Sequence, residues 1–181
     1  MVPRLLGEKV DLRAPSLLPK DILKLVEFNQ NEEVLMWTGR NTHISTKETC
    51  EEWIKKCLED ENDCLFFIYD KEHDILVGSC NLRYKYNHST NVELGILLGI
   101  DYVNQGFGTD TIKTLLKFAF DEMHAHRVML HADEANSRAI KAYTNCGFVQ
   151  CGLEHETNWA RGMWHNTVTM EILDRDYYNN R

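Results

Sequence analysis

The sequence predicts one mixed α/β domain over residues 1–181. Its sheet should be mostly antiparallel, with the antiparallel strands in the first part of the chain. Short stretches of alternating or continuous apolar residues, typical of strands, are interspersed with longer stretches of helical periodicity. No internal repeat, low-complexity tract or linker divides the chain. The expected order of elements is β-α-α-β-β-β-α-β-α-β-β, and 43% hydrophobic residues suffice for a sizeable core.

The first elements are a strand and a helix. Residues 8–15 alternate, with Val10 and Leu12 apolar, and predict the strand. Asp21 opens the helix, which runs to about Gln30. Its apolar positions recur at helical spacing and should face the core. They are Ile22, Leu25, Val26 and Phe28.

A second helix and three strands follow. The Ser-Thr-Lys-Glu pattern of residues 45–48 indicates a capping box. The helix that it starts ends near Asp60 and carries Trp53, Ile54, Cys57 and Leu58. Residues 65–70 and 75–86 predict two strands joined by a short polar turn. Residues 91–100 predict a third strand, which becomes apolar on both faces and should therefore lie centrally in the sheet.

The second half continues with a long amphipathic helix over residues 107–125. Its inward side chains are Ile112, Leu115, Leu116, Ala119 and Phe120. Residues 127–132 predict a strand, and residues 136–145 a short helix that a following glycine terminates. Residues 148–159 and 163–173 predict a closing hairpin.

Charge and composition exclude several classes of function. A net charge of -8 argues against general nucleic-acid binding, which requires a basic surface, but suits a cationic substrate such as an amine. No apolar run is long enough for a membrane span, and the first residues lack the apolar core of a signal peptide. The six cysteines show no paired CxxC spacing and the eight histidines are scattered, so we expect reduced thiols, a cytoplasmic protein and no metal site.

A glycine-rich turn is the most informative feature of the chain. Gly106 and Gly108 lie two residues apart between an apolar strand and the start of a helix. This arrangement can direct several backbone N–H groups at one point, where the helix dipole also favours a phosphate. The alternative is a plain helix start at a sharp turn. About thirty residues later, Asn136 and Tyr143 lie seven residues apart on one face of the second short helix.

These motifs resemble the GNAT superfamily of acetyl-CoA-dependent N-acyltransferases, and more narrowly the RimJ/RimL branch of ribosomal-protein and spermidine acetyltransferases. The G-x-G turn, the N-x-x-A-x-x-x-Y segment and the G-F pair occur in the family's order and spacing. The matching residues are 9–15, 92–95, 106–109, 126–128, 136–143 and 147–148. The resemblance implies the GNAT fold, with helices on both faces of the sheet, and acetyl-CoA as co-substrate. Val103 departs from it, because the family usually has Arg or Gln there.

The resemblance also implies where acetyl-CoA binds. Its pantetheine arm should run along the backbone of Ile96, Leu97 and Leu98, where an N–H, that of Leu97, polarises the thioester carbonyl. Asn136 should hold the arm or cap its helix, and Arg138 should meet phosphates. The residues expected around the pyrophosphate are Asn104, Gln105, Gly106, Phe107, Gly108 and Thr109.

Tyr143 matches the family's general acid, because a neutral phenol can donate a proton to the departing thiolate. Its alternative role is that of a core tyrosine. Glu93 matches a strand glutamate that serves as base in some relatives, although it could equally pair with a neighbour. Weaker alternatives for the base are Glu154, Glu156 and His165, and the residues expected around the acceptor are Trp37, His43, Trp53, Glu93 and His165.

The acceptor amine stays open at this point. It is either the α-amine of a protein N-terminus or a small amine such as a polyamine or an aminoglycoside, and acidic clusters such as residues 59–61 would suit polycations. Relatives often form homodimers, so a homodimer is possible here. A non-catalytic acyl-CoA-binding protein is the alternative from another class, but the presence of both Asn136 and Tyr143 argues against it.

Overall fold

A twisted sheet runs through the part of the chain that the computed structural model describes, which is residues 4–38, 44–85 and 90–179. Its eight strands follow the order β1-β2-β3-β4-β5-β6-β8-β7. Each pair is antiparallel except β5 with β6. The strands are β1 (Leu5–Leu6), β2 (Val10–Arg13), β3 (Asp63–Asp70), β4 (Ile75–Tyr84), β5 (Asn91–Leu98), β6 (Arg127–Asp133), β7 (Val149–Ala160) and β8 (Met163–Leu173).

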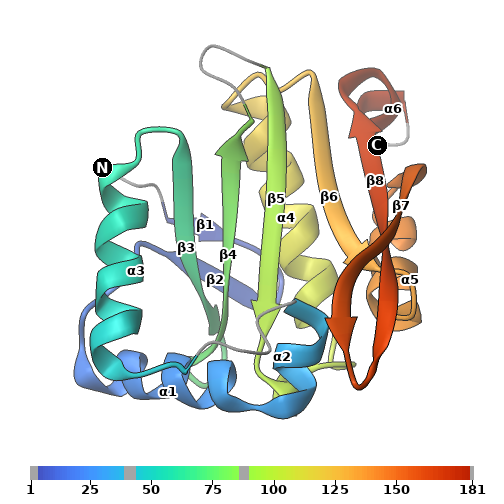
Figure 1. Ribbon diagram of the computed structural model, residues 1–181. Helices are drawn as coiled ribbons and strands as arrows, with labels where there is room; N and C mark the ends of the chain where they lie inside the picture. Colours follow the sequence, from blue (N-terminus) through green and yellow to red (C-terminus); the bar gives the residue numbers. More distant parts are fainter. Residues whose placement is uncertain (1–3, 39–43, 86–89, 180–181) are drawn as a thin grey trace.

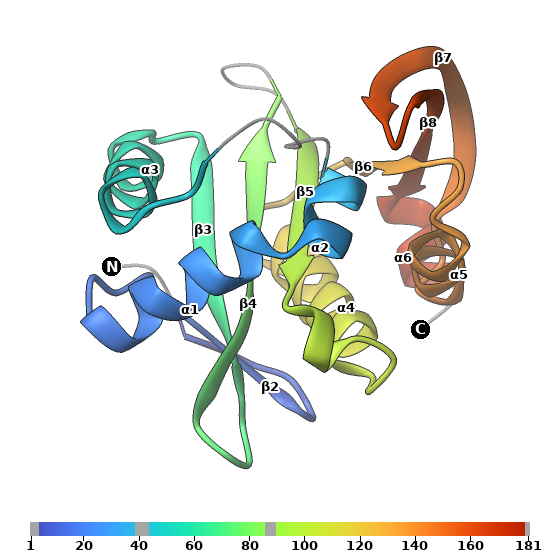
Figure 2. The ribbon, with the colours of Figure 1, turned by 60° about the horizontal axis from the view of Figure 1, so that its bottom comes forward.

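Helices cover both faces of this sheet, as Figures 1 and 2 show. They are α1 (Pro19–Gln30), α2 (Glu32–Thr38), α3 (Lys47–Glu59), α4 (Phe107–Asp121), α5 (Ser137–Asn145) and α6 (Asp174–Asn179), with a 3-10 turn at Ile100–Tyr102. α4 packs on one face in a large apolar cluster that includes Leu115, Leu116 and Phe120. α1 and α3 pack on the other face in a smaller cluster around Phe67 and Tyr69. The expected layering is therefore confirmed.

Strand alternation divides the residues of β5 between the two faces. Leu94 belongs to the cluster beneath α4, whereas Leu97 packs against the cluster beneath α1 and α3. Leu97 and Glu93 are four residues apart, so they share a face, as the sequence predicts. β5 is also the fifth strand of the eight, which confirms its expected central place.

β5 and β6 separate soon after they pair. Their parallel ladder consists of Asn91 with Arg127, Val92 with Val128 and Glu93 with Met129. β5 then continues to Leu98 paired only with β4, and β6 continues to Asp133 paired only with β8. Figure 1 shows the two strands diverging below this point. The divergence leaves one edge of β5 open on the inside of the sheet.

The element order is confirmed, but several boundaries differ from those expected. α1 begins at Pro19 rather than Asp21, because proline suits the first helical turn. The capping box of α3 consists of Thr46 and Thr49, one residue later than Ser45 and Glu48: each side chain accepts from the other residue's backbone N–H. α4 ends at Asp121 rather than residue 125.

Four short elements were not expected from the sequence. β1, α2, the 3-10 turn and α6 contain two to seven residues each. Segments of this length span too few positions for a hydrophobic period to emerge. α2 matters most for function, because it brings Trp37 and Thr38 to the region where β5 and β6 separate.

Candidate functional site

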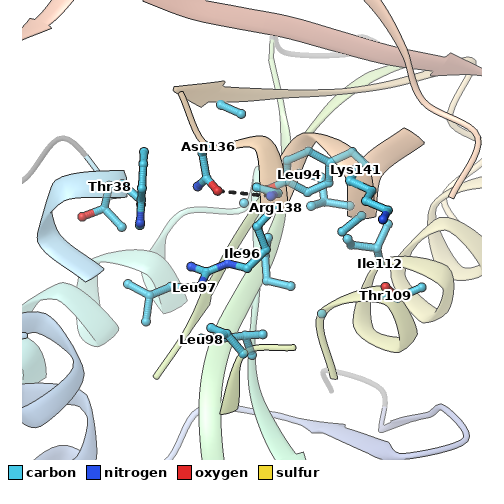
Figure 3. A pocket seen from close by; sticks show the side chains of 18 of the residues that line it. Thr38, Leu94, Ile96, Leu97, Leu98, Thr109, Ile112, Asn136, Arg138 and Lys141 are labelled. Atoms are coloured by element: carbon cyan, nitrogen blue, oxygen red, sulfur yellow. Dashed lines mark hydrogen bonds between the residues drawn. The ribbon is translucent and has the colours of Figure 1, made fainter. Parts of the chain in front are cut away.

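A cleft of about 790 Å³ lies where β5 and β6 separate. Its walls come from α2, β5, the start of α4, the end of β6 and α5. Figure 3 shows Thr38 on one side, Thr109, Ile112 and Lys141 on the other, and the side chains of β5 between them. Of the expected site residues, it is lined by Trp37, Glu93, Ile96, Leu97, Leu98, Asn104, Gly106, Gly108, Thr109, Asn136, Arg138 and Tyr143.

The glycine turn forms the start of α4 and faces this cleft. Gly106 is the N-cap residue with φ of 88°, a left-handed conformation that glycine adopts without strain, and Asn104 before it has φ of 61°. No side chain caps the helix. The N–H groups of its first turn therefore have no acceptor within the helix, which is the arrangement that binds phosphate.

Two of the residues expected around the pyrophosphate do not line the cleft. Phe107 is buried in the core, and the side chain of Gln105 turns back to donate from Nε2 to the Asp101 carbonyl at 2.6 Å. Both border a smaller hollow on the other side of the turn. The side chains of these two residues therefore point away from the cleft, so any contact that they make with the pyrophosphate would come from their backbone N–H groups.

Lys9 supports the turn from behind, a role that the sequence analysis did not assign to it. Lys9 Nζ donates to the carbonyl oxygen of Gln105 at 2.9 Å, although the two residues lie far apart in sequence. It brings a positive charge to the turn in a protein that has Val103 where the family usually has a cation or an amide. Asp110 fixes the segment before Lys9, because its carboxylate accepts from the backbone N–H groups of Glu8, Lys9 and Val10.

The open edge of β5 offers its backbone to the cleft. The side chains of Ile96, Leu97 and Leu98 line the cleft, and their backbone groups on the unpaired side are available to an extended ligand. Gly95 lies so close to Asn81 on β4 that a Cβ there would overlap its amide oxygen. This part of β5 therefore offers aliphatic side chains and backbone groups, with no polar side chain.

Asn136 and Tyr143 lie at opposite ends of α5. Asn136 is the N-cap residue, and its Oδ1 accepts from the Ala139 N–H at 3.1 Å (Figure 3). Because the N-cap bond uses only this oxygen, the amide nitrogen can still serve a ligand. Tyr143 is 8% exposed, packs against Phe148 and lines the cleft. Burial raises the pKa of Tyr143 to about 12, so its phenol is neutral and can donate a proton.

The side of the cleft that contains Glu93 is polar. The Glu93 side chain is 43% exposed, and its Oε1 lies 4.0 Å from His131 Nε2. His131 also lines the cleft, but the sequence analysis did not single it out, because a polar residue in a strand usually faces solvent. Arg138 and Lys141 line the opposite wall, and Arg138 Nη1 lies 3.8 Å from Glu33 Oε1 on α2.

Several weaker candidates lie elsewhere. Trp53 packs against the apolar cluster of α1 and α3, and Glu154 and Glu156 are exposed on β7 outside the cleft. His165 does not line the cleft: it is 11% exposed, and its Nδ1 lies 2.9 Å from a carboxylate oxygen of Asp133. His43 lies outside the described residues. The expected substrate role of His165 finds no support in its position.

The described residues contain no group of three or more His, Cys, Asp or Glu side chains that could hold a metal ion. Within the same residues, no helix is both long and apolar enough to pass through a membrane.

Comparisons with known proteins identify the family of this chain. The family described as acetyltransferase (GNAT) domain matches residues 10–149. A spermidine N(1)-acetyltransferase from Vibrio cholerae is 26% identical over 88% of this chain and 91% of its own length. The putative ribosomal N-acetyltransferase YdaF from Bacillus subtilis is 24% identical over 89% and 90%. Both kinds of relative fit the branch that the sequence motifs indicate.

The solved structures confirm the fold. The crystal structure of spermidine N-acetyltransferase from Vibrio cholerae in complex with CoA and spermine superposes with a TM-score of 0.85. It covers 96% of this chain and 100% of its own, at 23% sequence identity. A GNAT-family acetyltransferase from Bacillus anthracis superposes with a TM-score of 0.81 over 96% and 99%, at 20% identity.

Gly106→Asp should weaken acetyl-CoA binding at least tenfold, about 1.4 kcal/mol. A side chain there would point toward Lys9, so the carboxylate would offset the positive charge behind the turn and repel phosphate. Isothermal calorimetry measures the Kd. Gly162→Asp is the matched control, because Gly162 also has positive φ but lies in the hairpin turn with nothing within 4 Å. Equal affinity of the folded Gly106→Asp variant and the wild type would show that phosphate binds elsewhere.

Tyr143→Phe should lower turnover by about 10²- to 10⁴-fold with little change in acetyl-CoA affinity, if the hydroxyl protonates the thiolate. Stopped-flow detection of free thiol measures the chemical step. Tyr102→Phe is the control, because Tyr102 is a partly buried tyrosine that packs against Phe28 and Phe107. Unchanged chemistry in Tyr143→Phe would reduce Tyr143 to a packing role.

The same variant should alter stability at high pH. Burial raises the folded-state pKa of Tyr143 to about 12, above the ordinary value near 10, so its contribution to stability is complete below pH ~10. That contribution falls as the pH rises from about 10 to 12. Urea unfolding across this range should therefore show a shallower loss of stability for Tyr143→Phe than for the wild type.

Proposed function

Since the chain belongs to the GNAT family of acetyltransferases, whose members use acetyl-CoA, we propose that its acceptor is a small polycationic primary amine of the polyamine class. The enzyme transfers the acetyl group to an amine nitrogen. The proposal assigns the start of α4 and the open edge of β5 to acetyl-CoA. It assigns the side of the cleft that contains Glu93 to the amine.

The observation that carries the proposal is the environment of Glu93. Its cross-strand neighbour on β4 is Arg83, which could have neutralised it. Instead, the Arg83 guanidinium pairs with Asp60 at 2.5 Å, away from the cleft. The Glu93 carboxylate thus remains half-exposed at the cleft, where it can attract an ammonium group. The net charge of -8 favours cationic substrates in the same direction.

The chemistry assigned to the site is direct attack. The neutral amine adds to the thioester carbonyl, a carbon–nitrogen bond forms and the carbon–sulfur bond breaks. A backbone N–H of the open β5 edge, that of Leu97 in our proposal, stabilises the negative charge on the carbonyl oxygen. Tyr143 supplies the proton for the departing sulfur, and the Asn136 side chain holds the arm that leads to it.

Several relatives are spermidine acetyltransferases, which supports a polyamine as the acceptor. A spermidine N(1)-acetyltransferase from Escherichia coli is 28% identical over 87% of this chain and 83% of its own length. A protein N-terminus, as for a ribosomal acetyltransferase, is the competing acceptor, and an aminoglycoside is another. We also propose a cytoplasmic location, where buried thiols such as Cys50 and Cys80 stay reduced.

We further propose that the chain forms a homodimer. The end of the β7–β8 hairpin exposes more than half of Trp159, Met163 and Trp164, and β7 lies at the edge of the sheet. Exposed apolar side chains beside an unpaired strand edge are typical of an interface. Analytical ultracentrifugation should give twice the mass of one chain, and the mass of a single chain at micromolar concentration would contradict the proposal.

An acceptor screen tests the proposed function. Acetyl-CoA is supplied with spermidine, spermine, an aminoglycoside or N-terminal peptides, and released thiol is measured with the product mass. We expect turnover with spermidine or spermine, at a kcat/KM at least ten times that for any peptide. Turnover with peptides alone would assign the enzyme to protein N-termini. Absence of turnover with every amine, despite acetyl-CoA binding, would favour a non-catalytic acyl-CoA-binding protein.

The role of Glu93 in binding is checked in the same assay. Glu93→Gln should raise KM for spermidine about fivefold, corresponding to about 1 kcal/mol for a half-exposed charge pair, with KM for acetyl-CoA unchanged. Glu154→Gln is the control, because Glu154 is exposed on β7 outside the cleft. A larger effect at Glu154 would place the amine near the hairpin instead.

A further inference from the structure

His131 occupies a position that the proposed reaction does not yet use. It lies on β6 two residues after Met129, the last residue that pairs with β5. Its side chain is 31% exposed and lines the cleft where the two strands separate. Glu93 faces it from the other strand, with 4.0 Å between Oε1 and Nε2. The two side chains therefore lie on either side of the point from which the cleft opens.

We propose that His131 is the base that removes the proton from the acceptor ammonium, with Glu93 stabilising the imidazolium that results. This inference rests on the proposed function, because it requires an amine acceptor. It adds a catalytic residue that lies outside the sequence motifs of the family and comes from a different strand than Glu93.

The imidazole ring is held in place by the neighbouring strand. Thr169 is the cross-strand partner of His131 on β8, and its hydroxyl oxygen lies 3.2 Å from His131 Nδ1. Thr169 is 8% exposed, so this contact is shielded from solvent. When Nδ1 carries the hydrogen and donates to Thr169, the lone pair of Nε2 is free to accept a proton on the side of Glu93.

Two other carboxylates near His131 each lie beside a basic side chain. On the same face of the neighbouring strands, the Asp133 carboxylate lies beside His165, and the Glu171 carboxylate pairs with Arg127 at 2.5 Å. Among the residues that the structure describes, this leaves the Glu93 carboxylate to face the ring. A positive charge on His131 would therefore meet the Glu93 carboxylate directly, while the cations Arg138 and Lys141 of α5 line the same cleft.

The basicity of an imidazole favours histidine over a carboxylate as the group that removes the proton from the amine. An amine carries a proton at neutral pH and cannot attack until it loses it. In model peptides the pKa of an imidazolium is about two units above that of a carboxylic acid, so an imidazole takes a proton more readily than a carboxylate does. The first proton passes from the ammonium to Nε2 and then to solvent. The nitrogen loses a second proton as the amide forms. That proton replaces the one that Tyr143 gives to sulfur, so Tyr143 ends the cycle as a neutral phenol.

The test compares His131→Gln with the wild type, using spermidine and acetyl-CoA over a range of pH. We expect kcat/KM for spermidine to fall about 10²-fold at neutral pH, with the loss shrinking as the pH rises and the free amine becomes abundant. KM for acetyl-CoA should stay unchanged. Imidazole added to His131→Ala should restore part of the lost rate, which a purely structural role would not allow.

Thr169→Val tests how the ring is held. It removes the hydroxyl beside Nδ1 and should lower the rate less than His131→Gln, with the same pH dependence. Thr167→Val is the matched control, because Thr167 lies two residues away on β8 and its hydroxyl contacts Thr157 instead. A readout without turnover is the NMR signal of the His131 ring, assigned by its absence in His131→Gln. It should shift when spermidine is added without acetyl-CoA.

The outcomes separate this inference from the proposed function. Wild-type turnover of spermidine with an unchanged pH profile in His131→Gln would overturn the role of His131 and leave the acceptor assignment intact. A loss that is uniform with pH, together with no rescue by imidazole, would also overturn it. A ring signal unmoved by spermidine would place the amine away from His131. Absence of wild-type turnover with every amine would overturn both proposals together.

Discussion

β5 and β6 pair through three residues and then separate, and the remaining parts of the site depend on this separation. Each strand keeps a full antiparallel ladder on its other side, β5 with β4 and β6 with β8. The two halves of the sheet therefore diverge without breaking a ladder, and the inner edges of β5 and β6 keep unpaired backbone groups beyond the three paired residues. Unpaired backbone groups away from water are costly, so an open inner edge favours an extended ligand that can pair with it.

The two sides of the cleft also carry groups of opposite charge. On one side, the start of α4 directs its first-turn N–H groups inward, and the cations Arg138 and Lys141 line the wall. On the other, the Glu93 carboxylate faces His131. An anionic carrier and a cationic acceptor can approach from these two sides and meet between them. Because attraction of opposite charge acts before contact, this arrangement would guide each proposed substrate to its own side of the cleft.

The sequence anticipated this architecture where a feature depends on local chemistry. The glycine turn needs a left-handed residue, Asn136 caps α5, and the apolar positions of α4 repeat at helical spacing, so each is visible in a short window. Features that arise from contacts between distant segments were missed. Lys9 reaches the turn from the first strands, and His131 acquires its role only through Thr169 and Glu93 on two other strands. The direction of the Gln105 side chain, away from the cleft, was equally invisible in a short window of sequence.

The start of α4, which no side chain caps, links the stability of the fold to the binding of the carrier. The N-cap residue of α4 is Gly106, which costs roughly a few tenths of a kcal/mol relative to a Ser, Thr or Asp at that position. In the proposed complex, a phosphate group of the carrier would accept hydrogen bonds from the first-turn N–H groups of α4. By mass action, a ligand at a hundred times its Kd adds about 2.7 kcal/mol to the stability of the protein that binds it. If the carrier binds here as proposed, the stability of the folded enzyme should rise with the concentration of coenzyme A in either form, because acetylated and free coenzyme carry the same phosphate groups.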